Sequence, residues 1–295
     1  MIKENQNKFF IICLSSAIPV CYYNQIRPDL CLSTDGGYWA GQHLKKLLKM
    51  DTILAASSES YCPKNILKKA KILPLDYKEG ISSTLFNQLS LNHIEAKRNG
   101  TVSGTALELA ISLSFFDIFF FGLDLSCSIS YQHTLPNELE LNNSLSDNKI
   151  NSLEKRAFIS SRNSQSLEIY KEWFKTKNIQ NRNVYRIIED DEKQNTLGNI
   201  HDISIKDFCN RIDKNPKIYK KEIIFYSNAK INNIVSKNTI LSLIKEENSK
   251  KLLFPLDFVS LQHNKDNQQT IIEKIDSKVE KLIKQVEKIF KIMGS

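Results

Sequence analysis

Residues 100–126, GTVSGTALELAISLSFFDIFFFGLDLS, decide the fold class that this sequence predicts. A loop of small residues leads into a helix, in which Leu107, Ala110 and Ile111 recur at helical spacing. Four apolar residues follow at positions 118–121, and such an unbroken run is typical of a central parallel strand covered on both faces. A helix that leads into a strand of this kind is half of a βαβ unit, so we expect a mainly parallel sheet.

The rest of the chain extends this pattern in both directions. Short apolar runs predict further strands at residues 9–14, 30–33, 52–56 and 183–187, with an edge strand at 72–75. Residues 39–48 predict an amphipathic helix between the strands at residues 30–33 and 52–56. From residue 203 onward the pattern is helical and rich in lysine, and a last helix near residues 270–292 carries one apolar stripe. We therefore predict an α/β fold, a Rossmann-like three-layer mainly parallel sheet at residues 1–200, with a helical carboxy-terminal extension at residues 201–295.

The composition disfavours several classes of protein. The chain has 295 residues, a net charge of +8, 41% hydrophobic and 25% charged residues, which is ordinary for a globular protein. Its six cysteines form no CxxC or Cys/His pairing, so we expect no zinc site, and we assign no metal ligand. The amino terminus is polar and no apolar run approaches a membrane span, so we expect a cytoplasmic protein without a signal peptide. The lysines of the last helices alternate with glutamates, which predicts a solvated face rather than nucleic-acid binding, and self-association through the last helix is a further expectation.

The loop at residues 100–105 is the first candidate binding site. Gly100 and Gly104 permit close approach of the backbone. Thr101, Ser103 and Thr105 offer hydroxyl groups where the N–H groups of a helix start would face an anion. Capping of the helix explains one of these hydroxyls but not three. We therefore predict that the loop contacts a phosphate or a sugar.

Two aspartates follow predicted strands. Asp124 comes after the strand at residues 118–121, and Asp35 comes after the strand at residues 30–33. Open α/β sheets bind their ligands at the carboxyl ends of the strands. A carboxylate in that place rarely serves packing, so we predict a site role for Asp124. Asp35 could hold a ribose hydroxyl, a metal or an acceptor, or it could close an Asx turn before the next helix.

His133 lies in a polar segment, residues 126–151, that has no clear periodicity and predicts a lid or a disordered insert. A histidine there could act as general base for an acceptor hydroxyl or contact a phosphate, or it could be an idle surface residue. We assign no role to the other four histidines, which are His43, His93, His201 and His263.

Two segments together resemble the motility accessory factor (Maf) family, whose core domain is also classed as 6-hydroxymethylpterin diphosphokinase MptE-like. Residues 26–35, IRPDLCLSTD, are similar to a strand of that family that carries Pro-Asp at its start and Ser-x-Asp at its end. Residues 104–125, from GTALELA through FGLDL, resemble its helix and its Gly-x-Asp-Leu strand end, and His133 matches its downstream histidine. The resemblance covers roughly residues 9–200. A bacterial sialyltransferase family of related fold has a similar loop, helix and strand end.

The resemblance implies a transferase that uses a phosphate-bearing donor. Members include bacterial proteins that put nonulosonic sugars on flagellin and archaeal enzymes that move a diphosphate from ATP to a pterin alcohol. By resemblance we expect a nucleotide-activated acidic sugar as donor, a flagellin-type protein hydroxyl as acceptor, and no required cofactor. His133 and Asp124 would then be catalytic, while Asp35 and the loop at residues 100–105 would bind substrate and phosphate. The alternative activity, diphosphate transfer, would require Mg²⁺ with ATP.

The sequence also departs from the family pattern. Family members usually carry a Gly-x-Gly-Pro-Ser-Leu turn, which is a phosphate or nucleotide cradle, on a strand upstream of the segment that matches residues 9–14. The sequence starts too late to hold that turn, and Ser160, Ser161 and Arg162 stand where the related sialyltransferases keep a histidine. A non-catalytic binding or assembly protein on the same sheet is therefore the third expectation, with the last helix as its partner surface.

Overall fold

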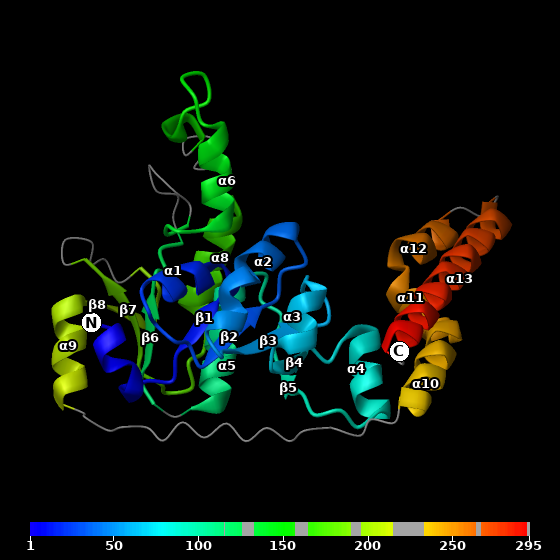
Figure 1. Ribbon diagram of the computed structural model, residues 1–295, viewed down its shortest axis with the longest axis horizontal. Helices are drawn as coiled ribbons and strands as arrows, with labels where there is room; N and C mark the ends of the chain where they lie inside the picture. Colours follow the sequence, from blue (N-terminus) through cyan, green and yellow to red (C-terminus); the bar gives the residue numbers. More distant parts are fainter. Residues whose placement is uncertain are drawn as a thin grey trace. The chain divides into compact units, whose positions relative to one another are not determined.

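The computed structural model describes residues 1–114, 116–125, 133–156, 165–189, 196–214, 233–263 and 267–293 (Figure 1). Packing divides the chain into two compact units. The first unit joins Met1–Leu75 to Ala96–Glu222, and the second joins Asp76–Glu95 to Ile223–Ser295. Residues 201–214 thus pack with the sheets, and residues 80–88 pack with the carboxy-terminal helices.

The first sheet has the strand order β1-β2-β3-β4-β5. Its strands are β1 (Ile12–Leu14), β2 (Leu30–Ser33), β3 (Ile53–Ser57), β4 (Ile72–Asp76) and β5 (Ile94–Glu95). The first four are parallel, with Cys13 opposite Cys31 and Cys31 opposite Leu54. Every residue of β2 is buried, as expected for a parallel strand covered on both faces. The predicted edge position of residues 72–75 is wrong, because β5 lies beyond β4 in the order.

A second parallel sheet has the order β6-β7-β8. Its strands are β6 (Ile118–Phe121), β7 (Val184–Ile188) and β8 (Ile200–Ser204). The predicted central place of residues 118–121 is wrong, because β6 stands at one end of the order and β7 is in the middle. The strand at residues 183–187 is not the last, because β8 follows it. His201 and Asp202 interrupt the apolar pattern of β8, and the buried Asp202 is neutralised by Arg186, whose Nε lies 2.7 Å from its Oδ1.

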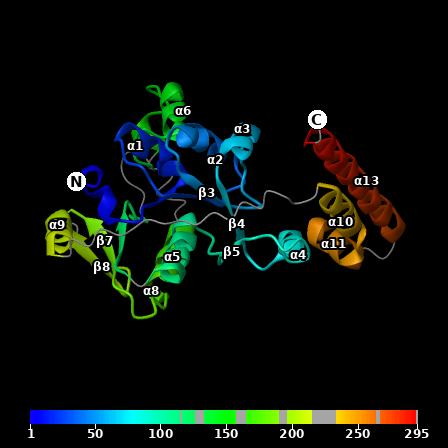
Figure 2. The ribbon, with the colours of Figure 1, turned by 60° about the horizontal axis from the view of Figure 1, so that its bottom comes forward.

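Helices cover both faces of the sheets (Figure 2). One face of the first sheet carries α1, α2, η3 and α3, while α5 lies on the opposite face and contacts β1 and β2. Together with α8, α5 also packs on one face of the second sheet, and α9 packs on the other. The bounds in this unit are η1 (Lys3–Lys8), η2 (Ser15–Ala17), α1 (Ile18–Tyr23), α2 (Tyr38–His43), η3 (Leu44–Lys49), α3 (Lys64–Lys69), α5 (Val102–Leu113), α6 (Glu138–Ser146), α8 (Gln165–Thr176) and α9 (Ile205–Lys214).

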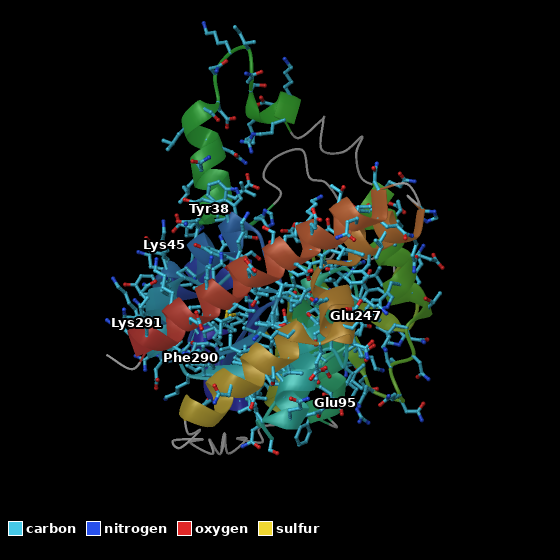
Figure 3. The ribbon with its side chains drawn as sticks, turned by 90° about the vertical axis from the view of Figure 1, so that its right-hand side faces the viewer. Tyr38, Lys45, Glu95, Glu247, Phe290 and Lys291 are labelled. Carbon is cyan, nitrogen blue, oxygen red and sulfur yellow. The ribbon has the colours of Figure 1, made fainter. Side chains whose placement is uncertain are left out.

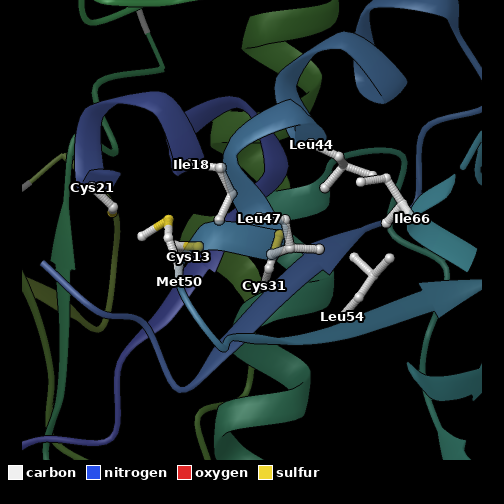
Figure 4. Close-up of a cluster of buried hydrophobic side chains, with 9 residues drawn as sticks. All are labelled: Cys13, Ile18, Cys21, Cys31, Leu44, Leu47, Met50, Leu54 and Ile66. Atoms are coloured by element: carbon white, nitrogen blue, oxygen red, sulfur yellow. The ribbon is translucent and has the colours of Figure 1, made fainter. Parts of the chain in front are cut away.

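The core of the first sheet shows why these segments form a layered fold. Cys13, Cys31 and Leu54 form one row across three strands and pack against side chains from α1, η3 and α3 (Figure 4). In the second sheet the sides alternate, with Val184 packing towards α5 and α8 and Tyr185 towards α9. The predicted α/β class, mainly parallel and layered with helices, is confirmed, although the strands form two sheets.

Apart from β5, the second unit is helical within the described residues. Its helices are α4 (Gly80–Gln88), α10 (Asn233–Lys245), α11 (Glu247–Leu253), α12 (Pro255–His263) and α13 (Gln268–Met293). Ile275 and Val279 of α13 pack with Ile244 of α10 and with Ile81 of α4. The predicted apolar stripe of the last helix is therefore a core face, and Phe290 and Lys291 lie near its far end (Figure 3). None of the helices within the described residues combines the length and apolar content needed to cross a bilayer.

Candidate functional site

The segments that follow β1, β2 and β3 meet at the carboxyl ends of these strands, which we call the carboxyl edge. The N–H of Tyr61, after β3, donates to the carbonyl of Asp35, after β2, over 2.9 Å. Arg98, just before α5, forms a bidentate ion pair with Glu59, also after β3. The start of α5 therefore lies at the same edge as Asp35. Ligands of open α/β sheets bind at such edges.

Asp35 closes a turn at this edge. Its Oδ1 accepts a hydrogen bond from the N–H of Gly37 over 2.8 Å, and α2 begins at the next residue. The carboxylate is exposed to solvent. The Asx turn that the sequence offers as one interpretation is therefore present, and it leaves the carboxylate open to further contacts.

His43, at the end of α2, is a residue that sequence reasoning missed. Its side chain is 6% exposed, and its Nδ1 has no hydrogen-bond partner among the described residues. Burial is the largest cause that lowers the pKa of His43, and electrostatic interaction with His133 also lowers it, while Glu138 and Asp35 act in the opposite direction. The side chains of His133, Glu138 and Asp35 thus lie within electrostatic range of His43. The sequence did contain one signal for His43. The change from loop to helix at Gly37 places His43 on the helix that starts at the carboxyl edge.

The helix α6 is fastened to this edge through its first residues. Asn137 is fully buried, and its Oδ1 accepts from the N–H groups of Leu139 and Glu140 over 3.0 and 3.3 Å. Its Nδ2 donates to the carbonyl of Ser16, after β1, over 3.2 Å. Lys45 lies 4.0 Å from Glu138, beside the base of α6 (Figure 3). The polar segment predicted as an irregular insert therefore contains a capped helix, and its residues 126–132 lie outside the described part of the chain.

His133 is held by a buried carboxylate. Oε1 of Glu140 accepts from the His133 N–H over 3.2 Å and lies 3.3 Å from its Nδ1. Glu140 is 1% exposed, and its Oε2 accepts from Arg156, which also forms two bonds with Asp147. An ionised carboxylate only accepts hydrogen bonds, so Nδ1 carries the proton and the lone pair of the neutral ring resides on Nε2. A histidine oriented in this way can act as a general base.

Glu140 and Arg156 were also missed by sequence reasoning. They lie sixteen residues apart, Arg156 donates to Glu140 over 3.2 Å, and no periodic pattern connects them. The only available signal was the pair Asn137 and Glu140, because a capping residue followed three positions later by glutamate is typical of a helix start. In the structure this glutamate turns to His133 and Arg156.

The backbone conformation and the close packing of the loop at residues 100–105 depend mainly on its two glycines. Gly100 has a φ of +68°, which favours glycine. A Cβ on Gly104 would approach Cβ of Asn99 to 2.9 Å and Trp173 to 3.1 Å. The hydroxyl of the buried Thr105 donates to the carbonyl of Lys97 over 3.2 Å and holds the loop against the helix. Thr101 is the N-cap residue of α5 but makes no side-chain capping bond, and Ser103 in the first turn is half-buried.

Asp124 occupies a different place. It follows β6 in the second sheet, is exposed, and makes no hydrogen bond or ion pair with the rest of the described chain. The preceding carbonyl, of Leu123, accepts a long bond from Arg186 over 3.5 Å. Asp35, His133 and the start of α5 therefore share the edge of the first sheet, whereas Asp124 follows a strand of the second.

Residues 1–130 match the family model described as 6-hydroxymethylpterin diphosphokinase MptE-like. A protein of Treponema pallidum (strain Nichols), named only as an uncharacterized protein, is 32% identical over 126 residues. That match covers 43% of this chain, and the chain spans only 28% of the length of this relative. No solved structure matches the chain significantly. The family match includes Asp35, the loop at residues 100–105 and Asp124, and it ends just before His133. The resemblance to the MptE-like family is therefore confirmed over residues 1–130.

Proposed function

We propose that this protein transfers a group from a nucleotide-activated donor to a hydroxyl acceptor at the carboxyl edge, with His133 as the general base. The observation that carries this proposal is the pairing of His133 with the buried Glu140, which leaves Nε2 able to take a proton. In its specific form, the donor is a nucleotide-activated acidic sugar and the acceptor is a hydroxyl of a flagellin-type protein, as in motility accessory factors.

The chemistry asked of His133 is a single proton transfer. Nε2 accepts the proton of the acceptor hydroxyl while the hydroxyl oxygen forms a bond to the anomeric carbon of the sugar. The bond from that carbon to the phosphate oxygen breaks, and the nucleotide leaves with the electron pair. Glu140 stabilises the imidazolium that forms, because its carboxylate already accepts from Nδ1. General-base catalysis of this kind contributes roughly 10²–10⁴-fold.

The leaving phosphate is assigned to the start of α5. Backbone N–H groups and the dipole at a helix start stabilise anions. The α5 start has no side-chain cap and no acidic residue in its first turn, which supports this assignment. In this proposal, Ser103 and Thr101 add hydroxyl groups to the phosphate site. Asp35 and Asp124 bind polar groups of the donor or of the acceptor.

Diphosphate transfer from ATP to a pterin-like alcohol is the second candidate, because the matching family model is described by that activity. This reaction would use Mg²⁺, which bridges phosphate oxygens and neutralises their charge. No group of three or more His, Cys, Asp or Glu side chains that could hold a metal occurs among the described residues. Mg²⁺ is commonly held by one or two carboxylates together with substrate phosphates, and the exposed Asp35 fits that role.

Thermal-shift and calorimetric binding of CMP, CDP, UDP, GDP and ATP, each with and without Mg²⁺, tests the proposal. We expect CMP to stabilise the protein without metal, and Ser103→Ala and Asp124→Asn to weaken this effect. Stabilisation by ATP only with Mg²⁺ would favour diphosphate transfer. Absence of any nucleotide effect would leave a non-catalytic binding protein.

Sugar transfer itself is tested with His133→Gln. We expect this variant to bind CMP as the parent protein does and to transfer roughly 10²–10⁴-fold more slowly. His263→Gln is the matched control, because His263 is exposed on α12. Full activity of His133→Gln would contradict the assignment of the base.

A further inference from the structure

Arg98 and Glu59 form a two-pronged ion pair beside the start of α5. Nη1 and Nη2 of Arg98 lie 2.7 and 2.6 Å from the two carboxylate oxygens of Glu59. The side chains are 47% and 54% exposed, so solvent and dissolved ions reach the pair. Hydrogen bonding and charge from Arg98 lower the pKa of Glu59. A guanidinium offers the same fork to a carboxylate and to a phosphate, so the two anions compete for it.

The adjoining helix start has unused donors. The N–H groups of Val102, Ser103 and Gly104 make no hydrogen bond to any described residue, and the first bonded one is Thr105, which donates to the carbonyl of Thr101. The helix has 12 residues, long enough for its dipole to favour an anion at this end. Most helices satisfy some of these donors with a capping side chain, which Thr101 does not provide here.

A buried hydroxyl without a partner lies on the same side of the sheet. Ser57, the last residue of β3, is 5% exposed, and its Oγ has no hydrogen-bond partner among the described residues. Leu54 and Ala56 pack towards η3 and α3, so the alternation along β3 turns Ser57 to the face that α5 covers (Figure 2). A buried hydroxyl without a partner costs about 1–3 kcal/mol, and a ligand oxygen would remove that cost. Glu59 lies two residues further along the chain.

We infer that Arg98 binds a phosphoryl group of the nucleotide donor. The Glu59 carboxylate occupies the Arg98 guanidinium until this phosphoryl group displaces it. The phosphoryl oxygens then also reach the N–H groups at the α5 start and the Ser57 hydroxyl. This inference rests on the proposed phosphate-bearing donor. Glu59 competes with the anion for Arg98, and this competition lowers the apparent affinity of the site for the anion. The exchange is inexpensive because an exposed ion pair contributes little stability.

Calorimetric titration with inorganic pyrophosphate, at fixed ionic strength, tests the inference. We expect Glu59→Gln to bind pyrophosphate up to roughly fivefold more tightly than the parent protein, because it removes the competing carboxylate. Arg98→Gln should weaken binding at least about tenfold, because the charged bidentate contact is lost. Ser57→Ala should weaken it less. Asp51→Asn is the matched control, because Asp51 pairs with Lys71 at 2.9 Å in an exposed ion pair of the same unit, and pyrophosphate binding should not change.

The outcomes separate this inference from the proposed function. If neither the parent protein nor Glu59→Gln binds pyrophosphate, or if Arg98→Gln binds it unchanged, the inference is wrong even where sugar transfer is observed. If the two variants change binding as expected while no transfer depends on His133, the phosphate site stands and the proposed reaction is wrong. Near-ultraviolet circular dichroism of each variant checks that the fold is kept.

Discussion

At the residue scale, His43 makes the stability of the protein depend on pH. Burial is the main cause that lowers its pKa below the ordinary value of 6.5, so the unfolded chain binds a proton at a higher pH than the folded chain does. The free energy of unfolding therefore falls as the pH drops below about 6.5, by up to about 1.4 kcal/mol for each unit by which the two pKa values differ. We expect urea titrations of His43→Gln at pH 7, 6 and 5 to show a smaller fall than the parent protein shows.

His263→Gln controls for the general effect of removing a histidine. Because His263 is exposed, its removal should leave the slope of stability against pH unchanged. An equal slope in the parent protein and in His43→Gln would contradict the prediction. The comparison uses slopes because His43→Gln also changes packing at every pH.

A second prediction at this scale concerns Asn137, which caps α6 and holds it to Ser16. Asn137→Ala loses both contacts, and we expect a loss of about 0.5–2 kcal/mol from the cap alone. Asn137→Asp keeps the acceptor for the cap but cannot donate to the Ser16 carbonyl. Urea unfolding of both variants separates the two contributions. Equal stability of Asn137→Ala and the parent protein would show that α6 is not fastened in this way.

At the element scale, the turn that precedes β8 depends on Gly198. Its φ is +61°, and a Cβ there would overlap the backbone of Lys175 in α8. We expect Gly198→Ala to lower the free energy of unfolding by roughly 2–4 kcal/mol, because a left-handed backbone and overpacking both cost energy. Gly122→Ala is the control, since Gly122 also has a positive φ but has open space around it, and we expect about 1 kcal/mol. Equal losses in the two variants, measured by chemical denaturation, would contradict the close packing of the turn on α8.

At the scale of the whole molecule, the division into two units predicts separate responses to mutation. Ile275 is 3% exposed in the core of the second unit, so Ile275→Ala should destabilise that unit by about 2–5 kcal/mol. Hydrogen exchange should then accelerate in α10–α13 and also in α4, which is distant in sequence but packs with α11. Protection of β1, β2 and β3 should be unchanged. Loss of protection in α10–α13 without any change in α4 would contradict the assignment of α4 to the second unit.

Particular residues show how far the sequence predicted the site. The loop at residues 100–105 and Asp35 were predictable, because small residues before a helix and an aspartate after a strand are local patterns. His43 was not, because its charged neighbour Glu138 comes from α6, which packs against α2. Glu140 and Arg156 were not, because sixteen residues without a periodic pattern separate them. Arg98 and Glu59 lie 39 residues apart, and only the positions of β3 and α5 bring them together.

The sequence by itself determined the parallel α/β class, since apolar runs separated by helical periodicity bury themselves in only a few ways. It also determined the apolar stripe of α13 and the residues that begin α5. The tertiary structure alone decided that the strands form two sheets, that β8 exists although it carries Asp202, and that α4 packs with the carboxy-terminal helices. The physical reason is that strand pairing, neutralisation of a buried charge and burial of a helix face each depend on partners distant in the chain. Local patterns state what must be buried, and the partners that bury it are selected only when the chain folds.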